Sequence, residues 1–217
     1  MATHETARVT RAGRAALLHG VYLIVNEGEP NPVAAAKAGL AAGIAIVQYR
    51  AKRGIDATHL RALREETRER GALLIVNDDC DATIAFDADG VHLGPDDAGF
   101  DRVAAVRTML GDRLIGLSCG TQAEARAAGD ADYLGVGAVY ATASKDDAGA
   151  PIGIDGLLAV ARATHLPVAA IGGITYDTLA DVRASGVAMA AVISAVANAH
   201  DPREAARALV ARWNDVA

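Results

Sequence analysis

Leu73-Leu74-Ile75-Val76-Asn77-Asp78-Asp79 is the stretch of this sequence that decides which fold we expect. Four apolar residues follow one another without a break, which is typical of a strand covered on both faces. An amide and two carboxylates come directly after them. In a parallel barrel the carboxyl ends of all strands meet at one mouth, where the chemistry takes place. The stretch therefore predicts a barrel strand that delivers polar side chains to such a mouth.

Seven more apolar runs of this kind lie on either side of it, separated by segments with helical periodicity. The eight expected strands are Val21–Val25, Ile44–Tyr49, Leu73–Val76, Gly90–Leu93, Leu114–Leu117, Tyr133–Val136, Val168–Ile171 and Ala190–Ile193. Eight alternations of strand and helix predict an α/β fold with a single (β/α)8 barrel, the TIM barrel. The alternative is an open doubly wound sheet, which usually has fewer strands at this length.

Capping residues mark several of the expected helices. Asp56 is suited to cap a helix that ends before Gly71. Thr121 with Glu124 forms the pattern of a capping box. These signals fall between the apolar runs and therefore support the alternation.

Length and composition favour one domain. The chain has 217 residues, enough for a full core, and we expect a polar N-terminal arm or cap over residues 1–20 and a catalytic barrel over residues 21–217. Because 52% of the residues are hydrophobic and only 4% are aromatic, the core must consist mainly of Ala, Val, Leu and Ile. The net charge of −6 argues against nucleic-acid binding, so an anionic substrate requires a local basic patch.

The cysteines and the apolar segments bear on the compartment. Cys80 and Cys119 lack the spacing of a metal site and cannot form a disulfide framework, which favours a reducing compartment. Residues 1–14 lack the apolar stretch of a signal peptide, and residues 187–199 are too few to span a bilayer. We expect a cytoplasmic protein that binds small molecules and no membrane. The sequence leaves open whether the protein forms a homo-oligomer.

Two cations and an amide end the second expected strand. If the chain stays extended, alternation places Gln48, Arg50 and Lys52 on the same side. Such a group can hold a diphosphate, because arginine offers a planar fork and lysine a point charge. The alternative is a solvated basic turn before Gly54.

Carboxylates follow the third and fourth expected strands. Asn77 can bind a base edge, and Asp78 with either Asp96 or Asp97 offers the oxygen ligands that Mg²⁺ prefers. The alternative is a turn that caps the next helix. His92 lies inside a strand, and we interpret it as a hydrogen-bonded core histidine rather than a catalyst.

The fifth and sixth strands are followed by a hydroxyl and a lysine. Ser118 can bond a substrate, but the sequence shows no partner base, so a serine hydrolase has little support. Cys119 beside it is interpreted as a bystander. Lys145 lies in a polar loop that could close over a phosphate, or could be an ordinary surface loop.

Glycines and a serine follow the last two strands. Gly172 and Gly173 allow backbone N–H groups to approach a phosphate closely. Ser194 adds an N–H group and a hydroxyl after the eighth strand. Phosphate sites recur in these two loops of the barrel. This pattern indicates a phosphorylated small molecule.

Seven motifs in one order connect these observations. They are Val47-Gln48-Tyr49-Arg50-Ala51-Lys52, Val76-Asn77-Asp78-Asp79, Ala88-Asp89-Gly90-Val91-His92-Leu93-Gly94, Gly116-Leu117-Ser118, Asp132-Tyr133-Leu134-Gly135-Val136-Gly137, Thr142-Ala143-Ser144-Lys145 and Ala170-Ile171-Gly172-Gly173-Ile174. With them the chain resembles the thiamine-phosphate synthase family from about Val21 to Trp213. The resemblance implies an enzyme in which a thiazole nitrogen displaces diphosphate from a pyrimidine methylene group by a dissociative path.

The resemblance also implies roles for individual residues. The pyrimidine diphosphate would be held by Gln48, Arg50, Lys52, Asn77, Ser118 and Lys145. Four of these, Arg50, Lys52, Ser118 and Lys145, would act in catalysis. Mg²⁺ would be held by Asp78 and Asp97. The thiazole phosphate would be held by Thr142, Ala143, Ser144, Gly173, Ile193 and Ser194.

The chain also departs from the family pattern. Pro95 replaces a usual glutamine, Gly120 a usual histidine and Ala51 a usual glutamate, whereas Thr142 and Ser144 keep both loop hydroxyls. Two alternatives therefore stay open. One is a thiazole tautomerase of the sister family, and the other is a paralogue that binds thiazole phosphate or thiamine phosphate without catalysis.

Overall fold

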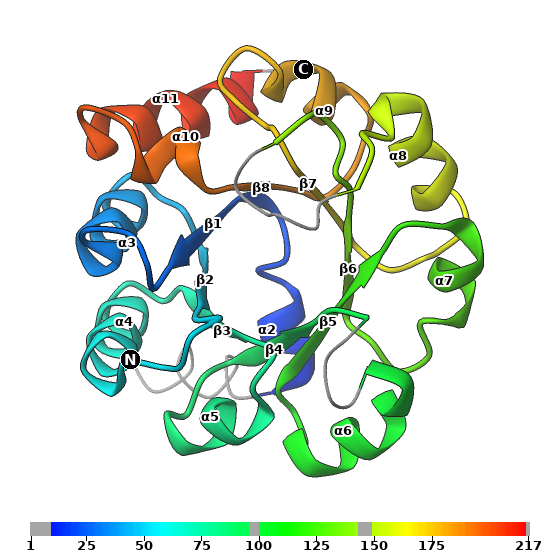
Figure 1. Cartoon of the computed structure of the whole chain (residues 1–217), viewed down its shortest axis with the longest axis horizontal. Helices are drawn as coiled ribbons and strands as arrows, with labels where there is room; N and C mark the ends of the chain where they lie inside the picture. The colour runs from blue at the N-terminus through cyan, green and yellow to red at the C-terminus, as the bar shows by residue number, and fades with distance from the viewer. Residues whose placement is uncertain (1–9, 96–99, 143–148, 216–217) are drawn as a thin grey trace.

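The computed structural model describes residues 10–95, 100–142 and 149–215. Its strands form one closed parallel barrel in which each pairs with the next and β8 pairs with β1 (Figure 1). The strands are β1 (Gly20–Asn26), β2 (Ile46–Arg50), β3 (Leu73–Asn77), β4 (Gly90–Leu93), β5 (Leu114–Cys119), β6 (Tyr133–Val136), β7 (Val168–Ile171) and β8 (Met189–Val192). The predicted (β/α)8 barrel is confirmed, and the open sheet is excluded.

Helices surround the barrel and cover its outer face (Figure 1). They are α3 (Pro32–Ala41), α4 (Ala57–Glu69), α5 (Cys80–Ala85), α6 (Val103–Leu110), α7 (Gln122–Ala127), α8 (Gly153–Ala161), α9 (Leu179–Ala184), α10 (Ser194–Ala197) and α11 (Pro202–Asp215), with a 3₁₀ turn η1 (Phe100–Arg102) before α6. The caps expected from the sequence are confirmed, because Asp56 accepts hydrogen bonds from the start of α4 and Thr121 forms a capping box with Glu124. Among the described residues, no helix is long and apolar enough to cross a membrane.

Alternating strand positions build two separate cores. The larger core lies between the strands and the surrounding helices and is made mainly of Ala, Val, Leu and Ile, as composition predicts. The smaller core fills the barrel interior, and there Tyr22 and Tyr133 are among the largest fully buried side chains. Ile46 also faces the interior, so Gln48 and Arg50, two and four positions later, face the same way. The two-residue period of the strand thus directs the side chains of Gln48 and Arg50 towards the mouth.

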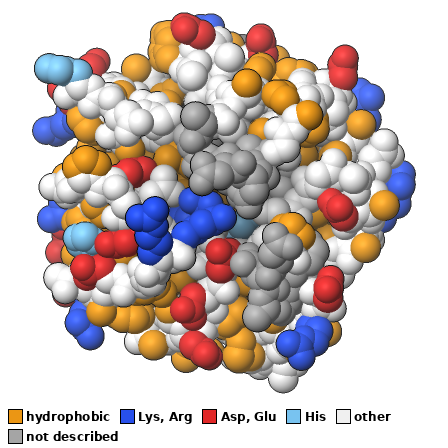
Figure 2. All heavy atoms as spheres, viewed as in Figure 1, with side chains coloured by type: hydrophobic (Ala, Val, Ile, Leu, Met, Phe, Trp, Pro, Cys, Tyr) orange, Lys and Arg blue, Asp and Glu red, His pale blue; other side chains and the backbone are white. Residues whose placement is uncertain are grey.

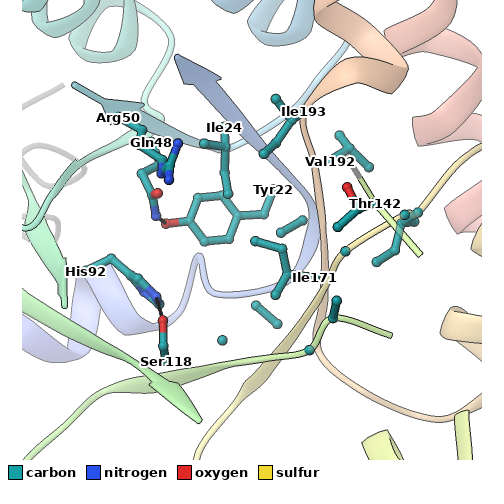
Figure 3. Close-up of a pocket in the computed structure, with 18 of the residues that line it drawn as sticks. Tyr22, Ile24, Gln48, Arg50, His92, Ser118, Thr142, Ile171, Val192 and Ile193 are labelled. Atoms are coloured by element: carbon teal, nitrogen blue, oxygen red, sulfur yellow. Dashed lines mark hydrogen bonds between the residues drawn. The ribbon is translucent and has the colours of Figure 1, made fainter. Parts of the chain in front are cut away.

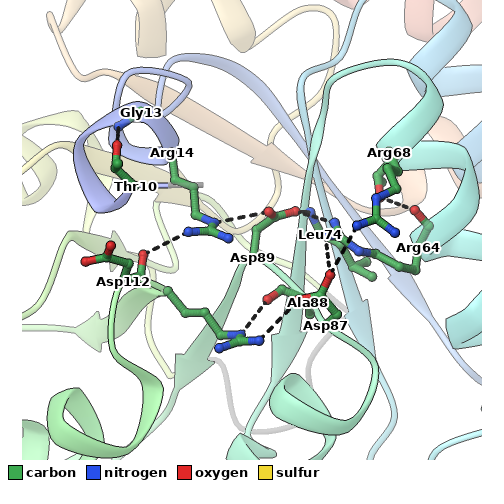
Figure 4. A network of polar contacts seen from close by, with 12 residues as sticks. Thr10, Gly13, Arg14, Arg64, Arg68, Leu74, Asp87, Ala88, Asp89 and Asp112 are labelled. Carbon is green, nitrogen blue, oxygen red and sulfur yellow. Dashed lines mark hydrogen bonds and ion pairs between the residues drawn. The ribbon is translucent and has the colours of Figure 1, made fainter. Parts of the chain in front are cut away.

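A short helix, α2 (Arg11–Ala15), crosses the opposite, amino-terminal end of the barrel (Figure 1). After it, Leu18 enters the barrel interior and is 4% exposed. Arg14 Nε donates to Asp89 Oδ1 at 3.2 Å, and Arg64 Nη1 donates to Asp89 Oδ2 at 2.8 Å (Figure 4). Arg11 pairs in the same way with Asp132. Because both aspartates directly precede strands, these ion pairs fix α2 to the floor of the barrel.

Candidate active site

A cavity of about 370 Å³ opens at the carboxyl ends of the strands. Tyr22, Ile24 and Ile171 supply apolar wall, while polar groups project from the neighbouring strands (Figure 3). Figure 2 views the same face and shows Lys and Arg side chains gathered beside its centre. The cavity can therefore hold a flat apolar ring next to an anionic group.

The structure brings most of the described candidate residues together. The following all line the one cavity: Gln48, Arg50, Asn77, Ser118, Thr142, Gly173, Ile193 and Ser194. They come from loops or strands at six different positions around the barrel. Four further candidates, Asp97, Ala143, Ser144 and Lys145, lie outside the described residues.

Lys52 does not share the cavity with Gln48 and Arg50. Strand β2 ends at Arg50 and the chain turns, so the alternation that was expected to align all three side chains stops before Lys52. Lys52 instead lines an adjoining open groove of about 790 Å³ together with Asp78. Asn77 lines both spaces and therefore connects them. Arg102, which the sequence did not single out, also lines the groove.

His92 lies in β4 and is hydrogen-bonded, as expected from the sequence. It also lines the cavity, which the interpretation as a core histidine did not include. Its Nε2 lies 3.1 Å from Ser118 Oγ, so this serine does have a ring nitrogen as a partner (Figure 3). Its inward position on β4 was the available signal, but the pairing with β5 that brings it to Ser118 is a tertiary feature. Tyr22 also lines the cavity, and the sequence did not indicate it because its place there is a tertiary feature as well.

Arg50 is held in place from the neighbouring strand. Its Nη1 donates to Asn26 Oδ1 at 3.2 Å, and Asn26 Nδ2 donates to Glu29 Oε1 at 2.9 Å. Burial raises the pKa of Glu29 above its ordinary value. These contacts orient the guanidinium at the rim of the cavity without neutralising it directly.

The packing of the loops requires glycine at positions 172 and 173, in addition to the room that these glycines leave for a phosphate. Gly172 and Gly173 have φ values of +99° and +64°. A Cβ atom on Gly173 would lie 2.5 Å from the carbonyl oxygen of Ala141. Tyr140 N donates to Gly172 O at 3.0 Å, which ties the loop after β6 to the loop after β7. Glycine is thus required for the two loops to close this side of the cavity.

Cys119 lines the cavity but is a poor nucleophile. Burial, with the nearby charge of Glu124, raises the pKa of its thiol to about 11. Glu124 itself accepts from the backbone N–H groups of Gly120 and Thr121, at 2.7 and 3.1 Å. The thiol therefore stays protonated near neutral pH, in agreement with the bystander interpretation.

A second group with metal-ligating atoms lies beyond β1 and β2. Ligand atoms of Glu27, Asp56 and His59 all lie within 4.8 Å of one another. Glu27 already accepts from the hydroxyl of Tyr49 and lies 3.3 Å from His59 Nδ1, and Asp56 caps α4. These contacts account for the three side chains as a structural cluster.

Comparisons with known proteins agree with this geometry. The family model described as Thiamine monophosphate synthase matches residues 21–196. A thiamine-phosphate synthase from Chloroflexus aurantiacus is 44% identical over 80% of this chain and 81% of its own length. The thiamine biosynthesis bifunctional protein ThiM/ThiE of Symbiobacterium thermophilum is a longer protein. It is 48% identical over 88% of this chain, and the matched region covers 40% of its own length.

A solved structure shows the same similarity. Thiamine phosphate pyrophosphorylase from Pyrococcus furiosus superposes with a TM-score of 0.82 and is 34% identical, covering 92% of this chain and 97% of its own. On these grounds the chain belongs to the thiamine monophosphate synthase family.

Proposed function

We propose that this chain is a transferase that joins hydroxymethylpyrimidine diphosphate to thiazole phosphate and releases diphosphate, forming thiamine phosphate. One observation carries the proposal. Gln48 and Arg50 on β2 and Ser118 on β5 line the same cavity as Gly173 and Ser194, which follow β7 and β8. An apolar wall with polar groups at separate places suits two ring substrates that each carry phosphate.

The side chains fit a reaction that needs no covalent intermediate. As diphosphate leaves, negative charge grows on its oxygens, and cations placed beforehand lower the barrier. Arg50 lines the cavity and Lys52 the groove that adjoins it. We assign Lys145 to the same task from the sequence motif alone. Ser118 and Gln48 would hold the pyrimidine ring.

The residues present fit a bound Mg²⁺. Asp78 stands directly after β3, on the groove beside Lys52 and next to Asn77. Its φ of +67° is unusual for a residue other than glycine, and it turns the chain at this point. Together with phosphate oxygens and Asp97, which the sequence motif alone assigns, the Asp78 carboxylate would give the hard donor set that Mg²⁺ prefers. When bound, the ion would neutralise charge on the leaving diphosphate.

The test is formation of thiamine phosphate and diphosphate from the two substrates with Mg²⁺, measured with and without EDTA. We expect product in equal amounts with diphosphate, lost with EDTA and restored by excess Mg²⁺. Saturable thiazole-phosphate binding without any product would overturn the proposal in favour of the tautomerase or the non-catalytic paralogue. The cytoplasmic location stays a prediction that localisation of the tagged protein in cells can check.

A further inference from the structure

Five side chains from five strands form a continuous chain of hydrogen bonds, and all of them except Tyr133 line the cavity. Gln48 Nε2 donates to Tyr22 OH at 2.7 Å. Tyr22 OH lies 2.9 Å from Tyr133 OH, which lies 3.1 Å from His92 Nδ1. His92 Nε2 lies 3.1 Å from Ser118 Oγ. We call these five residues the hydroxyl relay; its two ends, Gln48 and Ser118, both line the cavity (Figure 3).

The barrel interior is shaped to hold the relay. A Cβ atom on Gly116 would lie 2.2 Å from the Tyr133 ring, and one on Gly135 would lie 2.9 Å from the His92 ring. The missing side chains at these two positions therefore make room for the two rings. Tyr133 also packs edge-on against Tyr22, with ring centroids 6.0 Å apart. Tyr22 and Tyr133 are 1% and 0% exposed, so water does not compete for their hydroxyls.

The amide of Gln48 sets the direction of every proton in the relay. An amide nitrogen can donate only, so the single proton of Tyr22 points to Tyr133. The proton of Tyr133 then points to His92 Nδ1. Because Nδ1 accepts a hydrogen bond, the neutral ring carries its proton on Nε2. The Nε2–H group then donates a hydrogen bond to Ser118 Oγ.

The two ends of the relay consequently present opposite hydrogen-bonding groups. Gln48 keeps its carbonyl oxygen, an acceptor, for the cavity, and Ser118 keeps its hydroxyl proton, a donor. An aminopyrimidine carries the complementary pair, an amino group that donates and ring nitrogens that accept. Burial raises the pKa of both tyrosines, so their hydroxyls stay protonated at neutral pH.

We propose that the hydroxyl relay selects the aminopyrimidine ring by fixing Gln48 as acceptor and Ser118 as donor, with Tyr22, Tyr133 and His92 as positioning residues. This inference rests on the proposed function, because it names how that same cavity recognises one of the two substrates. The relay also explains why Ser118 bonds a histidine without being a hydrolase nucleophile. Its hydroxyl oxygen accepts a hydrogen bond from His92 Nε2 instead of donating one to a base.

The first test reads the relay in the protein without substrate. Histidine labelled with ¹⁵N, observed through long-range ¹⁵N–¹H correlations at neutral pH, reports which ring nitrogen carries the proton. The His92 signals are assigned by their loss in His92→Gln. We expect a neutral ring protonated at Nε2. Protonation at Nδ1 would reverse the relay and overturn the proposal, and so would a doubly protonated ring.

The second test breaks the relay away from the cavity. Tyr133→Phe removes the hydroxyl between Tyr22 and His92, and we expect KM for the pyrimidine diphosphate to rise about tenfold while KM for thiazole phosphate stays within about twofold. Tyr49→Phe is the matched control, because Tyr49 is equally buried but its hydroxyl contacts Glu27 outside the relay. Equal effects of both variants, or an unchanged pyrimidine KM in Tyr133→Phe, would overturn the proposal.

The two tests separate this inference from the proposed function. If the wild-type protein forms no thiamine phosphate, the proposed function fails, while the His92 protonation state still decides the direction of the relay. If Tyr133→Phe does not fold, the same measurement on the wild-type protein decides.

Discussion

Asp78 shows what a single residue can decide at this site. Asp78 and Asp79 both line the groove next to the cavity, but the carboxylate of Asp79 also caps α5 by accepting from Ala82 N at 2.8 Å. Two neighbouring carboxylates of the same type thus have different environments. The difference gives a paired test of the metal assignment.

We predict that Asp78→Asn lowers kcat/KM at least about a hundredfold, because it removes a charged oxygen ligand next to the leaving diphosphate. Asp79→Asn is the control, since asparagine caps helices as well as aspartate does. Steady-state kinetics over a range of Mg²⁺ concentrations measure both. Full activity of Asp78→Asn would remove this residue from the metal site.

Cys119 gives a second prediction at the residue scale. With a thiol pKa of about 11, roughly one thiol in a thousand is ionised at pH 8. Alkylation by iodoacetamide should therefore be slow at pH 8 and accelerate as the pH approaches 11. Peptide mass spectrometry after timed exposure measures the rate. Rapid modification of Cys119 at pH 7 would contradict its buried, protonated state.

Single residues also show where sequence reasoning stops. Gln48, Arg50 and Ser118 were predicted because each stands at the carboxyl end of an apolar run. The direction of Lys52 was predicted wrongly, because it depends on the position at which β2 ends. The contact of His92 with Ser118 depends on the register between two strands, which periodicity within either strand does not contain.

At the scale of elements, the loop after β7 packs directly on the loop after β6. The close approach of Gly173 to Ala141 leaves no space for a side chain. Gly186, which follows α9, also has a positive φ, of +80°, but a Cβ atom there would meet nothing within 4 Å. The two glycines separate backbone strain from steric clash.

We predict that Gly186→Ala lowers the free energy of unfolding by about 1 kcal/mol, from the backbone conformation alone. Gly173→Ala should cost roughly 2–4 kcal/mol and also raise KM for thiazole phosphate, because the clash displaces the loop. Urea denaturation and steady-state kinetics measure the two effects. Equal stability losses with an unchanged KM would show that the close approach is unimportant.

The α2 helix supplies a further prediction. Arg14 is 8% exposed and pairs with the buried Asp89, whereas Lys37 on α3 forms an ion pair with Glu66 and its side chain is 52% exposed. Asp89 keeps Arg64 as a partner, so Arg14→Ala should lower the free energy of unfolding by about 1–3 kcal/mol. Lys37→Ala should cost less than about 1 kcal/mol. We expect kcat to be unchanged in both variants. A smaller loss of unfolding free energy in Arg14→Ala than in Lys37→Ala would contradict the role of α2 as a fixed cap.

Among the elements, the strands were easier to predict than α2. Continuous apolar runs located all eight strands to within two residues at either end. The position of α2 could not be predicted in this way, because Arg14 and Asp89 are 75 positions apart in the chain. No local pattern joins residues at that distance.

At the scale of the whole molecule, barrel closure turns scattered polar residues into one site. Candidates between positions 48 and 194 reach the same cavity because every strand points in the same direction. Alternation of strand and helix was sufficient to predict this convergence. The division of the site into a cavity and an adjoining groove depends on side-chain packing. The sequence did not predict this division.

The most direct measurement is a crystal structure of this protein with thiamine phosphate, diphosphate and Mg²⁺ bound. The central claim predicts the pyrimidine ring between Gln48 and Ser118, the thiazole phosphate at Gly173 and Ser194, and diphosphate with the metal beside Arg50 and Asp78. A product molecule with its two ends exchanged, or bound outside this cavity, would contradict the claim.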